Sequence, residues 1–344
     1  MKRLAILFVL LLLGCEAQPE GEIWRFAIEE TSGSVQDQYA QRFREMVHER
    51  TNGEVRVIVY PYGALGTSDH ITEQLHNATL ELAMSSPGHL GKLIPEVQAF
   101  LLHYLLSDDP EVNARALRDP ALRAFLDGLY AEKGLSFLTA FGEGRMAWTT
   151  REPVRRPEDF DGMRFRVMTS PLLLASYEAY GASPTPLPYS EVYSGLQLRM
   201  IDGQVNPVFA IEEMSFYEVT DHLIFPGHAE FVTTLAANPD WLESLPSERR
   251  RLIEDIVDTL QTEIYEVQSA LAEERLEAIR ARRPEMQIVT LDAEERAAFR
   301  ARAEPVRERY VELAGPRGRR LLQLIEAAVR RADGAFAGDD SVAQ

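Results

Sequence analysis

The sequence predicts an α/β protein of two lobes, each a mixed β-sheet covered by helices, with one long helix that braces both lobes. Two patterns lead to this fold class. Segments with strand and helix periodicity alternate along the chain in two successive series, and one amphipathic helical pattern continues over residues 246–283. With 344 residues, of which 45% are apolar and 26% charged, the chain is long enough for two globular domains.

The first alternating series begins with an expected strand over residues 23–28. Ser34 then caps a helix whose apolar residues repeat at helical spacing and which stops at Asn52-Gly53. The same alternation predicts further strands and helices. The strands are expected over 55–60, 80–84 and 135–141, and the helices from Thr67 or Ser68 and over 109–132.

The second series begins near Gly142 and includes a strand over 231–236 that returns to the first sheet. Its other strands are expected over 145–150, 163–167, 184–187 and 286–290, and its helices over 170–180, 190–200, 293–313 and 317–332. We therefore assign residues 23–143 plus 231–270 to lobe I, residues 144–230 plus 271–332 to lobe II, and residues 333–344 to a disordered tail. A chain that crosses repeatedly between two lobes is typical of a hinged protein with a ligand in the cleft.

The first 22 residues predict export. A basic start at Lys2-Arg3 precedes an apolar run over 4–13, which is too short to span a membrane and is typical of a secretory signal peptide. Cys15, the only cysteine, follows Leu-Leu-Gly in a pattern that resembles a bacterial lipobox, so we expect a lipid-anchored N-terminus, with a plain signal peptide as the alternative. A single cysteine excludes intrachain disulfides and thiolate zinc clusters.

Charge and motifs exclude several function classes. The net charge of −18 disfavours binding to nucleic acid or to anionic membranes. The chain has no Gly-x-Ser-x-Gly nucleophile motif, no phosphate-binding glycine loop and no pair of histidines at the spacing of a zinc peptidase. We expect no cofactor, no metal and no catalysis.

Two arginines stand near the ends of predicted strands. Arg166 lies in the alternating strand 163–167, and Arg145 follows Gly142-Glu143-Gly144. A guanidinium group offers a planar pair of donors that fits a carboxylate. Spacing alone does not distinguish such a binding residue from an arginine exposed on a strand edge.

Four segments carry a resemblance to a known family. They are Tyr-Ser-Glu-Val-Tyr-Ser-Gly-Leu-Gln at 189–197, Met-Ile-Asp-Gly-Gln-Val-Asn-Pro at 200–207, the Pro-Glu-Asp-Phe-Asp-Gly segment that leads into 163–167, and Gly-Ala-Ser-Pro-Thr-Pro at 181–186. Together they resemble the DctP-type solute-binding subunit of tripartite ATP-independent periplasmic (TRAP) transporters, over about residues 23–330. The resemblance implies a type II-like periplasmic-binding-protein fold. It also implies a monomer that captures a small organic acid outside the cytoplasm and delivers it to a TRAP permease, which an ion gradient drives.

The resemblance also implies roles for particular residues. Arg166 takes the place of the arginine that pairs with the solute carboxylate, Asn206 that of an asparagine bound to the same group, and Arg145 that of a second arginine. Tyr189 stands where an aromatic ring stacks on the solute. On the first lobe the candidates are loop and strand-end residues: Glu29, Ser34, Asp37, Ser85 and His89.

Several alternatives stay open at this point. The solute is a C4-dicarboxylate, a keto acid, a sugar acid or an aromatic acid. The rival functions are an exported enzyme acting on an organic acid and a sensory binding module that presents its ligand to a receptor. Turnover of a substrate would distinguish the enzyme, and the absence of a partner permease would distinguish the sensor.

Overall fold

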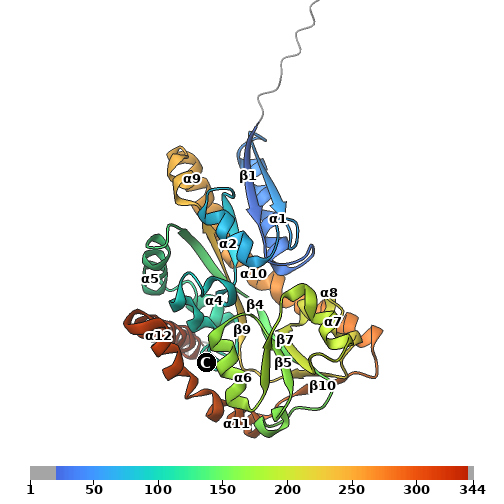
Figure 1. The fold of residues 1–344 in the computed structure, drawn as a ribbon. Helices are drawn as coiled ribbons and strands as arrows, with labels where there is room; N and C mark the ends of the chain where they lie inside the picture. Colours follow the sequence, from blue (N-terminus) through green and yellow to red (C-terminus); the bar gives the residue numbers. More distant parts are fainter. Residues whose placement is uncertain (1–20, 340–344) are drawn as a thin grey trace, which may run out of the picture.

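The structure is a computed structural model that describes residues 21–339 (Figure 1). Cys15 and the expected signal peptide lie outside the described residues. Ten strands form one hydrogen-bonded network in the order β2-β1-β3-β9-β4-β7-β5-β6, with β8 beside β4 and β10 beside β8. Helices cover this network, which gives the two-lobed, mixed α/β architecture that the sequence predicts.

The first lobe is built on a sheet in which β1 is parallel to β2 and β3, while β9 is antiparallel to β3 and β4. Its strands are β1 Glu22–Ala27, β2 Val55–Tyr60, β3 Leu82–Ser85, β9 Glu230–Ala237 and the first part of β4 Ser136–Thr150. The helices in this part of the chain are α1 Val35–Arg50, α2 Ser68–His76, α3 Pro87–Leu90, the 3-10 helix η1 Pro95–Leu101, α4 Pro110–Ala116, α5 Pro120–Ala131 and α9 Pro239–Ser244.

The second lobe uses the last residues of β4, which pair antiparallel with β7 and β8, while β5 pairs parallel with β6 and β7 and β10 with β8. The strands are β5 Arg164–Val167, β6 Ser183–Pro186, β7 Gly203–Pro207, β8 His222–Phe225 and β10 Gln287–Thr290. The helical elements are η2 Pro157–Phe160, α6 Pro171–Tyr180, η3 Tyr189–Glu191, α7 Val192–Gln197, α8 Val208–Glu213, η4 Phe216–Glu218 and α11 Ala293–Ala303.

Helix α1 shows how local sequence sets an element that later positions the site. The Ser34 hydroxyl accepts a hydrogen bond from the Asp37 amide at 3.1 Å, as the predicted N-cap should. The helix buries one apolar face against the first sheet and packs along α10. It ends where Asn52 and Gly53 take up left-handed conformations, with φ of 49° and 81°.

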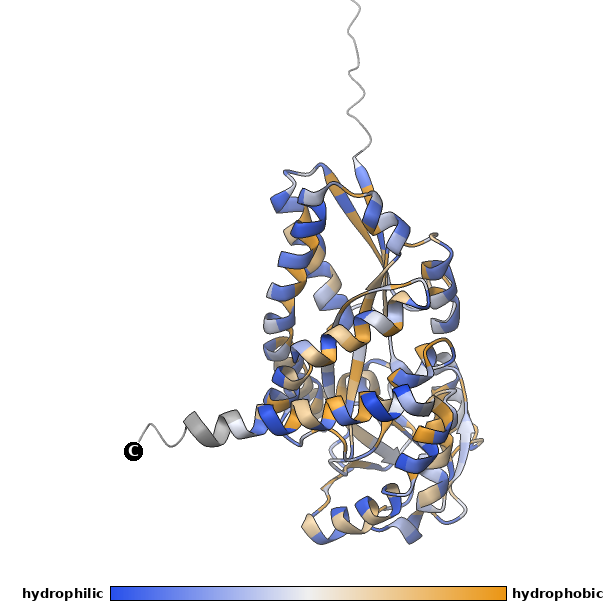
Figure 2. Cartoon of the chain, turned by 90° about the vertical axis from the view of Figure 1, so that its left-hand side faces the viewer, coloured by the Kyte–Doolittle hydropathy of each residue, from blue (hydrophilic) through white to orange (hydrophobic). Residues whose placement is uncertain are grey.

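The long helix α10, Ser247–Arg282, confirms the predicted brace. It contacts α1 and β4 of the first lobe and α8 of the second. Figure 2 shows hydrophilic residues along the outer faces of the helices and hydrophobic residues on the central strands. Within residues 21–339, no helix is both long enough and apolar enough to cross a membrane.

The predicted division into two strands, over 135–141 and 145–150, is wrong, because β4 continues through Gly142-Glu143-Gly144 from one sheet into the other. The glycines instead accommodate a register shift between Gly142 and Gly144 in the pairing with β9. Gly144 has φ +132°, and a Cβ on Gly142 would stand 1.9 Å from Glu230 Oε1. The two sheets therefore share one strand.

Three helix boundaries also differ from expectation. The predicted helix 109–132 is two helices, because Pro120 starts a new helix that Asp119 caps. The predicted helix 293–313 breaks after Ala303, whereas the predicted break between residues 313 and 317 is confirmed by the non-helical Gly315, which kinks α12, Val306–Asp339. This helix continues beyond the expected end of order at residue 332. This last helix packs on η1, α4, α5 and α6, so it contacts segments assigned to both lobes.

A polar group of rings is buried beneath the second sheet. His103 Nδ1 lies 2.6 Å from the hydroxyl of Tyr180, and the rings of His103 and His228 are 4.5 Å apart. The Tyr177 hydroxyl accepts a hydrogen bond from Trp148 Nε1 at 2.9 Å. Burial lowers the pKa of His103 to about 3, so this imidazole is neutral across the physiological range.

Candidate functional site

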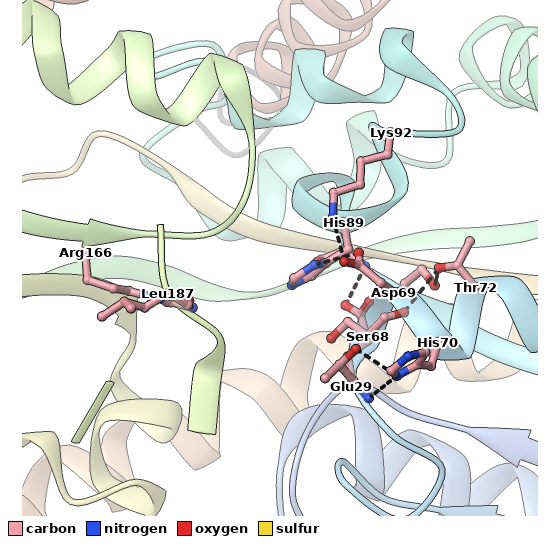
Figure 3. Close-up of polar contacts among 12 residues, drawn as sticks. Glu29, Ser68, Asp69, His70, Thr72, His89, Lys92, Arg166 and Leu187 are labelled. Atoms are coloured by element: carbon pink, nitrogen blue, oxygen red, sulfur yellow. Dashed lines mark hydrogen bonds and ion pairs between the residues drawn. The ribbon is translucent and has the colours of Figure 1, made fainter. Parts of the chain in front are cut away.

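Arg166 is a buried cation that no protein carboxylate neutralises. It is only 2% exposed, and among the described residues no Asp or Glu lies within ion-pair distance of it. Its Nε and Nη2 donate to the carbonyl oxygen of Leu187 at 3.0 and 2.8 Å (Figure 3). Burial lowers the pKa of Arg166 to about 10, so the group stays charged at neutral pH.

The neighbouring Arg164 differs from Arg166 in its exposure and in having a carboxylate partner. It lies on the same face of β5, two residues earlier, and its guanidinium forms a two-pronged ion pair with Asp202, with N–O distances of 2.9 and 2.6 Å. Arg164 is exposed and paired, whereas Arg166 is buried and unpaired. Burying a charge without a partner is costly, which points to a counterion supplied from outside the chain.

Asn206 stands on the strand next to Arg166. Strand β7 pairs with β5 at Arg166 and Gln204, so Gln204 and Asn206 lie on the same sheet face as the arginine. Gln204 donates to Thr149 Oγ1 at 2.9 Å and accepts from Asn206 Nδ2 at 2.5 Å. Asn206 is 8% exposed, and its bond to Gln204 fixes its amide on the sheet face that it shares with Arg166.

Two tyrosines extend this group toward the first lobe. The rings of Tyr189, in η3, and Tyr62, just after β2, meet edge to face with centroids 5.6 Å apart. Burial raises the pKa of Tyr189, and the charges of Glu30 and Glu213 raise it further while Arg166 opposes them. Tyr189 therefore lies within electrostatic reach of both the arginine and the two glutamates.

Three glutamates form what we call the acidic cluster: Glu30 and Glu143, which are buried, and Glu213, which is half-buried. Glu30 follows β1, Glu143 occupies the irregular point of β4, and Glu213 ends α8. Glu143 accepts from Gln36 Nε2 at 2.9 Å, and Glu213 accepts from the Thr31 hydroxyl at 2.7 Å. Burial raises the pKa of all three groups, that of Glu213 to about 7.

One carboxylate oxygen of each glutamate in the acidic cluster accepts no hydrogen bond. Glu30 Oε2, Glu143 Oε2 and Glu213 Oε1 are buried without a hydrogen-bond partner, and no Arg or Lys of residues 21–339 forms an ion pair with any of the three. Buried carboxylate oxygens are normally satisfied, so these three oxygens are free to accept from a cationic or N–H-bearing group.

The sequence prediction included Arg166, Asn206, Tyr189 and Ser34, and the structure places all four in this region. Ser34 belongs to it through its hydroxyl, which bonds to Glu30 as well as capping α1. The sequence analysis missed the three members of the acidic cluster. Its only available signals were a glutamate held between two glycines and a glutamate directly after a strand.

Arg145 lies elsewhere. It is exposed and lines a separate cavity of about 80 Å³ together with Glu230 and Arg296. Arg166 is not among the residues that line this cavity. The structure therefore does not bring the two predicted arginines together.

The remaining first-lobe candidates have local partners. His89 Nδ1 lies 3.5 Å from Asp69, which also pairs with Lys92 at 2.5 Å, and Figure 3 shows this group apart from Arg166 and Leu187. The Ser85 hydroxyl lies 3.3 Å from Thr72 Oγ1. Two other candidates have structural roles: Glu29 accepts from the Ser86 amide at 2.7 Å, and Asp37 accepts from the Gly33 amide at 2.8 Å.

The two lobes share a strand, and Tyr189 lies within electrostatic reach of both an unneutralised guanidinium and unsatisfied carboxylates. This arrangement is that of a protein that captures a small charged solute. In the part of the chain that the structure describes, no group of three or more His, Cys, Asp or Glu side chains is arranged to hold a metal ion. Comparison with known proteins identifies the family. Residues 26–313 match the model of the bacterial extracellular solute-binding proteins, family 7 (DctP), and the chain belongs to this family.

Three known proteins show the extent of the similarity. The ectoine-binding periplasmic protein TeaA of Halomonas elongata is 41% identical over 93% of this chain and 94% of its own, and its solved structure superposes with a TM-score of 0.87. The ectoine/5-hydroxyectoine-binding protein UehA of Ruegeria pomeroyi is 39% identical over 90% of this chain and 91% of its own. A TRAP solute-binding protein of Marinobacter aquaeolei, in an apo open structure, is 43% identical over 88% of this chain and 99% of its own, with a TM-score of 0.84.

These findings confirm the resemblance seen in the sequence. The chain is the periplasmic solute-binding subunit of a TRAP transporter, which hands its solute to the membrane subunits. It is a binding protein and not an enzyme, and transport rather than sensing is its function.

Proposed function

We propose that the captured solute is a small zwitterion of the ectoine type. Its carboxylate binds Arg166 and Asn206, and its cationic ring faces the acidic cluster. This retains the carboxylate solute expected from the sequence and adds a positive charge to it. Ectoine fits this description, because it carries a carboxylate and a cationic amidine on one six-membered ring.

The arginine supports the carboxylate half of the proposal. A guanidinium has five N–H donors, and the Leu187 carbonyl takes two of them. The other donors and the Asn206 amide remain for a solute carboxylate. Charge-assisted hydrogen bonds contribute about 1.5–3 kcal/mol each, so two or three of them support micromolar binding.

The acidic cluster supports the cationic half. A solute with only negative charge would be repelled by Glu30 and Glu213, whose charges act on Tyr189 together with that of Arg166. A solute with both charges satisfies the guanidinium and the unpaired carboxylate oxygens together. The tyrosine rings add a surface on which a cationic ring can stack.

The relatives support the same solute class. The two periplasmic proteins that are about 40% identical to this chain over nine-tenths of its length are named for binding ectoine and 5-hydroxyectoine. Relatives named for dicarboxylates are less similar, at 30% identity or below. We infer that this chain takes up ectoine or a close analogue.

Calorimetry with three matched compounds tests the proposal. They are ectoine, the same ring without its carboxylate (2-methyl-tetrahydropyrimidine), and succinate as an acid without a cation. We expect ectoine to bind at least 100-fold more tightly than either of the others. Tighter binding of succinate than of ectoine would refute the cationic half of the proposal and leave a plain acid as the solute.

Lobe closure and lipid anchoring are separate proposals. The division into 23–143 plus 231–270 and 144–230 plus 271–332 predicts that the lobes close on the solute, which scattering would detect as a smaller radius of gyration on adding ectoine. A lipid on Cys15 rests on the sequence pattern alone. Palmitate labelling of the wild type that is lost in Cys15→Ser would support it, and an unlabelled wild type would refute it.

A further inference from the structure

We propose that Glu143 holds a proton shared with Glu30 in the empty protein, and that capture of a cationic solute expels this proton. Glu143 then acts as a positioning residue, because it prepares the Glu30 carboxylate that faces the solute. The inference rests on the proposed function, since it requires a solute with a positive charge.

The geometry of the pair carries the argument. Glu30 and Glu143 are both buried, at 6% and 0% exposure, each leaves one carboxyl oxygen unpaired, and each acts on the ionisation of the other, so the two groups are near enough for a hydrogen bond between them. Two carboxyl groups can form such a bond only when one of them bears a proton. The N-terminal part of α1 fixes the arrangement, because Gln36 Nε2 donates to Glu143 and the Ser34 hydroxyl bonds to Glu30.

Within residues 21–339, no Arg or Lys forms an ion pair with Glu30 or Glu143, and Arg275 acts on the third member of the acidic cluster, Glu213. The charged and titratable groups that act on it are carboxylates, Glu29 on Glu143 and Glu213 on Glu30, while Tyr189 lies beside them as a phenol. Arg275 is paired with Glu212 at 3.0 Å. Burial and the neighbouring negative charges both raise the pKa of the pair, so one proton remains near neutral pH.

A cationic ring would replace that proton. Its N–H groups can donate to Glu30 Oε2 and Glu143 Oε2, which are buried and unpaired in the empty protein. The positive charge then favours the fully ionised pair, and the proton passes to the solvent. Proton and charge balance, because the protein exchanges one H⁺ for one cationic group.

This exchange makes affinity depend on pH with a definite sign. Below the pKa of the empty pair, binding must release a proton, so affinity rises about tenfold for each pH unit. Above that pKa the pair is already ionised, and affinity levels off. Acidification weakens binding, which is the reverse of what an anionic solute would show against the same carboxylates.

Calorimetry with ectoine in buffers of different ionisation enthalpy counts the released protons. At pH 6, about one pH unit below the pKa of Glu143, we expect the wild type to release close to one proton. Glu143→Gln keeps an acceptor for Gln36 and gives Glu30 a donor that cannot leave, so release should fall by about one proton and the affinity profile should flatten. Glu230→Gln is the matched control: another buried carboxyl with a pKa raised to about 7, which accepts from Asn113 and lines other cavities. This variant should release as many protons as the wild type.

The outcomes separate the two claims. Release that disappears in Glu143→Gln and persists in Glu230→Gln supports the shared proton. Ectoine binding with no release in the wild type, or with undiminished release in Glu143→Gln, overturns the shared proton and leaves the zwitterionic solute standing. Failure of ectoine to bind the wild type at any pH overturns both. A carbon-13 NMR titration of the empty protein supplies a check without solute, because a glutamate carboxyl that titrates near neutrality must disappear in Glu143→Gln.

Discussion

Replacing Arg166 by methionine should separate binding from folding. In the free protein the change removes two hydrogen bonds to the Leu187 carbonyl, which contribute about 1.5–3 kcal/mol each at most. It also removes a buried charge. Burial lowers the pKa of this group to about 10, and a shift of that size corresponds to a cost of about 3 kcal/mol. These two effects largely cancel, so we expect the urea midpoint of the free protein to stay close to that of the wild type.

In the complex nothing compensates for the loss. Removing one partner of a buried ion pair costs about 3–5 kcal/mol, so the affinity for ectoine should fall by a factor between about one hundred and several thousand. Arg164→Met is the control, since this arginine is on the same face of the same strand but is exposed and paired with Asp202. Its affinity should match the wild type. A variant Arg166→Met that binds ectoine normally would refute the role of this arginine.

Three further predictions test other parts of the structure. Unfolded His103 takes up a proton below about pH 6.5, whereas the folded residue does so only near pH 3. Its contribution to the free energy of unfolding is therefore complete above pH 6.5 and falls by about 1.4 kcal/mol per pH unit below that value. Urea unfolding between pH 7 and 5 should show that the free energy of unfolding of His103→Phe falls less on acidification than that of the wild type. Gly142→Ala should lower the unfolding free energy by about 1–3 kcal/mol, because the new Cβ would meet Glu230 Oε1 at 1.9 Å. Gly128→Ala, in an open position on α5, should not lower it, and equal effects would contradict the steric argument. Tyr189→Ala should weaken ectoine binding by about tenfold or more through loss of the ring. Tyr189→Phe should change the affinity little, because the hydroxyl makes only a 3.4 Å contact with the Ala210 carbonyl oxygen. Equal losses of affinity in both variants, measured by calorimetry, would show that the hydroxyl and not the ring binds the solute.

The alternation of strands and helices was predictable, because periodicity and capping act locally. Ser34 capped α1 as expected, and the pattern over 246–283 became one helix. The errors arose where long-range pairing overrides local preference. Gly142 and Gly144 are typical of a loop by themselves, yet β9 and β7 hold them within a strand.

The sequence predicted the arginine of the candidate site but not its glutamates, because the contacts between distant segments that bring these glutamates together are not visible in a local pattern. Arg166 was a candidate because it lies in an alternating strand and matches the arginine of the family resemblance, although strand spacing alone did not show that it is buried. The glutamates did not stand out, because 54 acidic residues make any single carboxylate uninformative. What distinguishes Glu30 and Glu143 is their burial and their mutual contact, and only the folded chain brings together residues so distant in sequence.

The position of β9 has a consequence for how the protein acquires its structure. This strand separates β3 from β4 in the first sheet, pairing Ala237 with Leu82 on one side and with Ser136 on the other. The N-terminal lobe thus stays incomplete until the last third of the chain is available, and such distant pairings form slowly. An exported chain whose first lobe cannot fold until a distant strand is available stays unfolded, and so able to be translocated, for longer than a chain whose first domain folds independently.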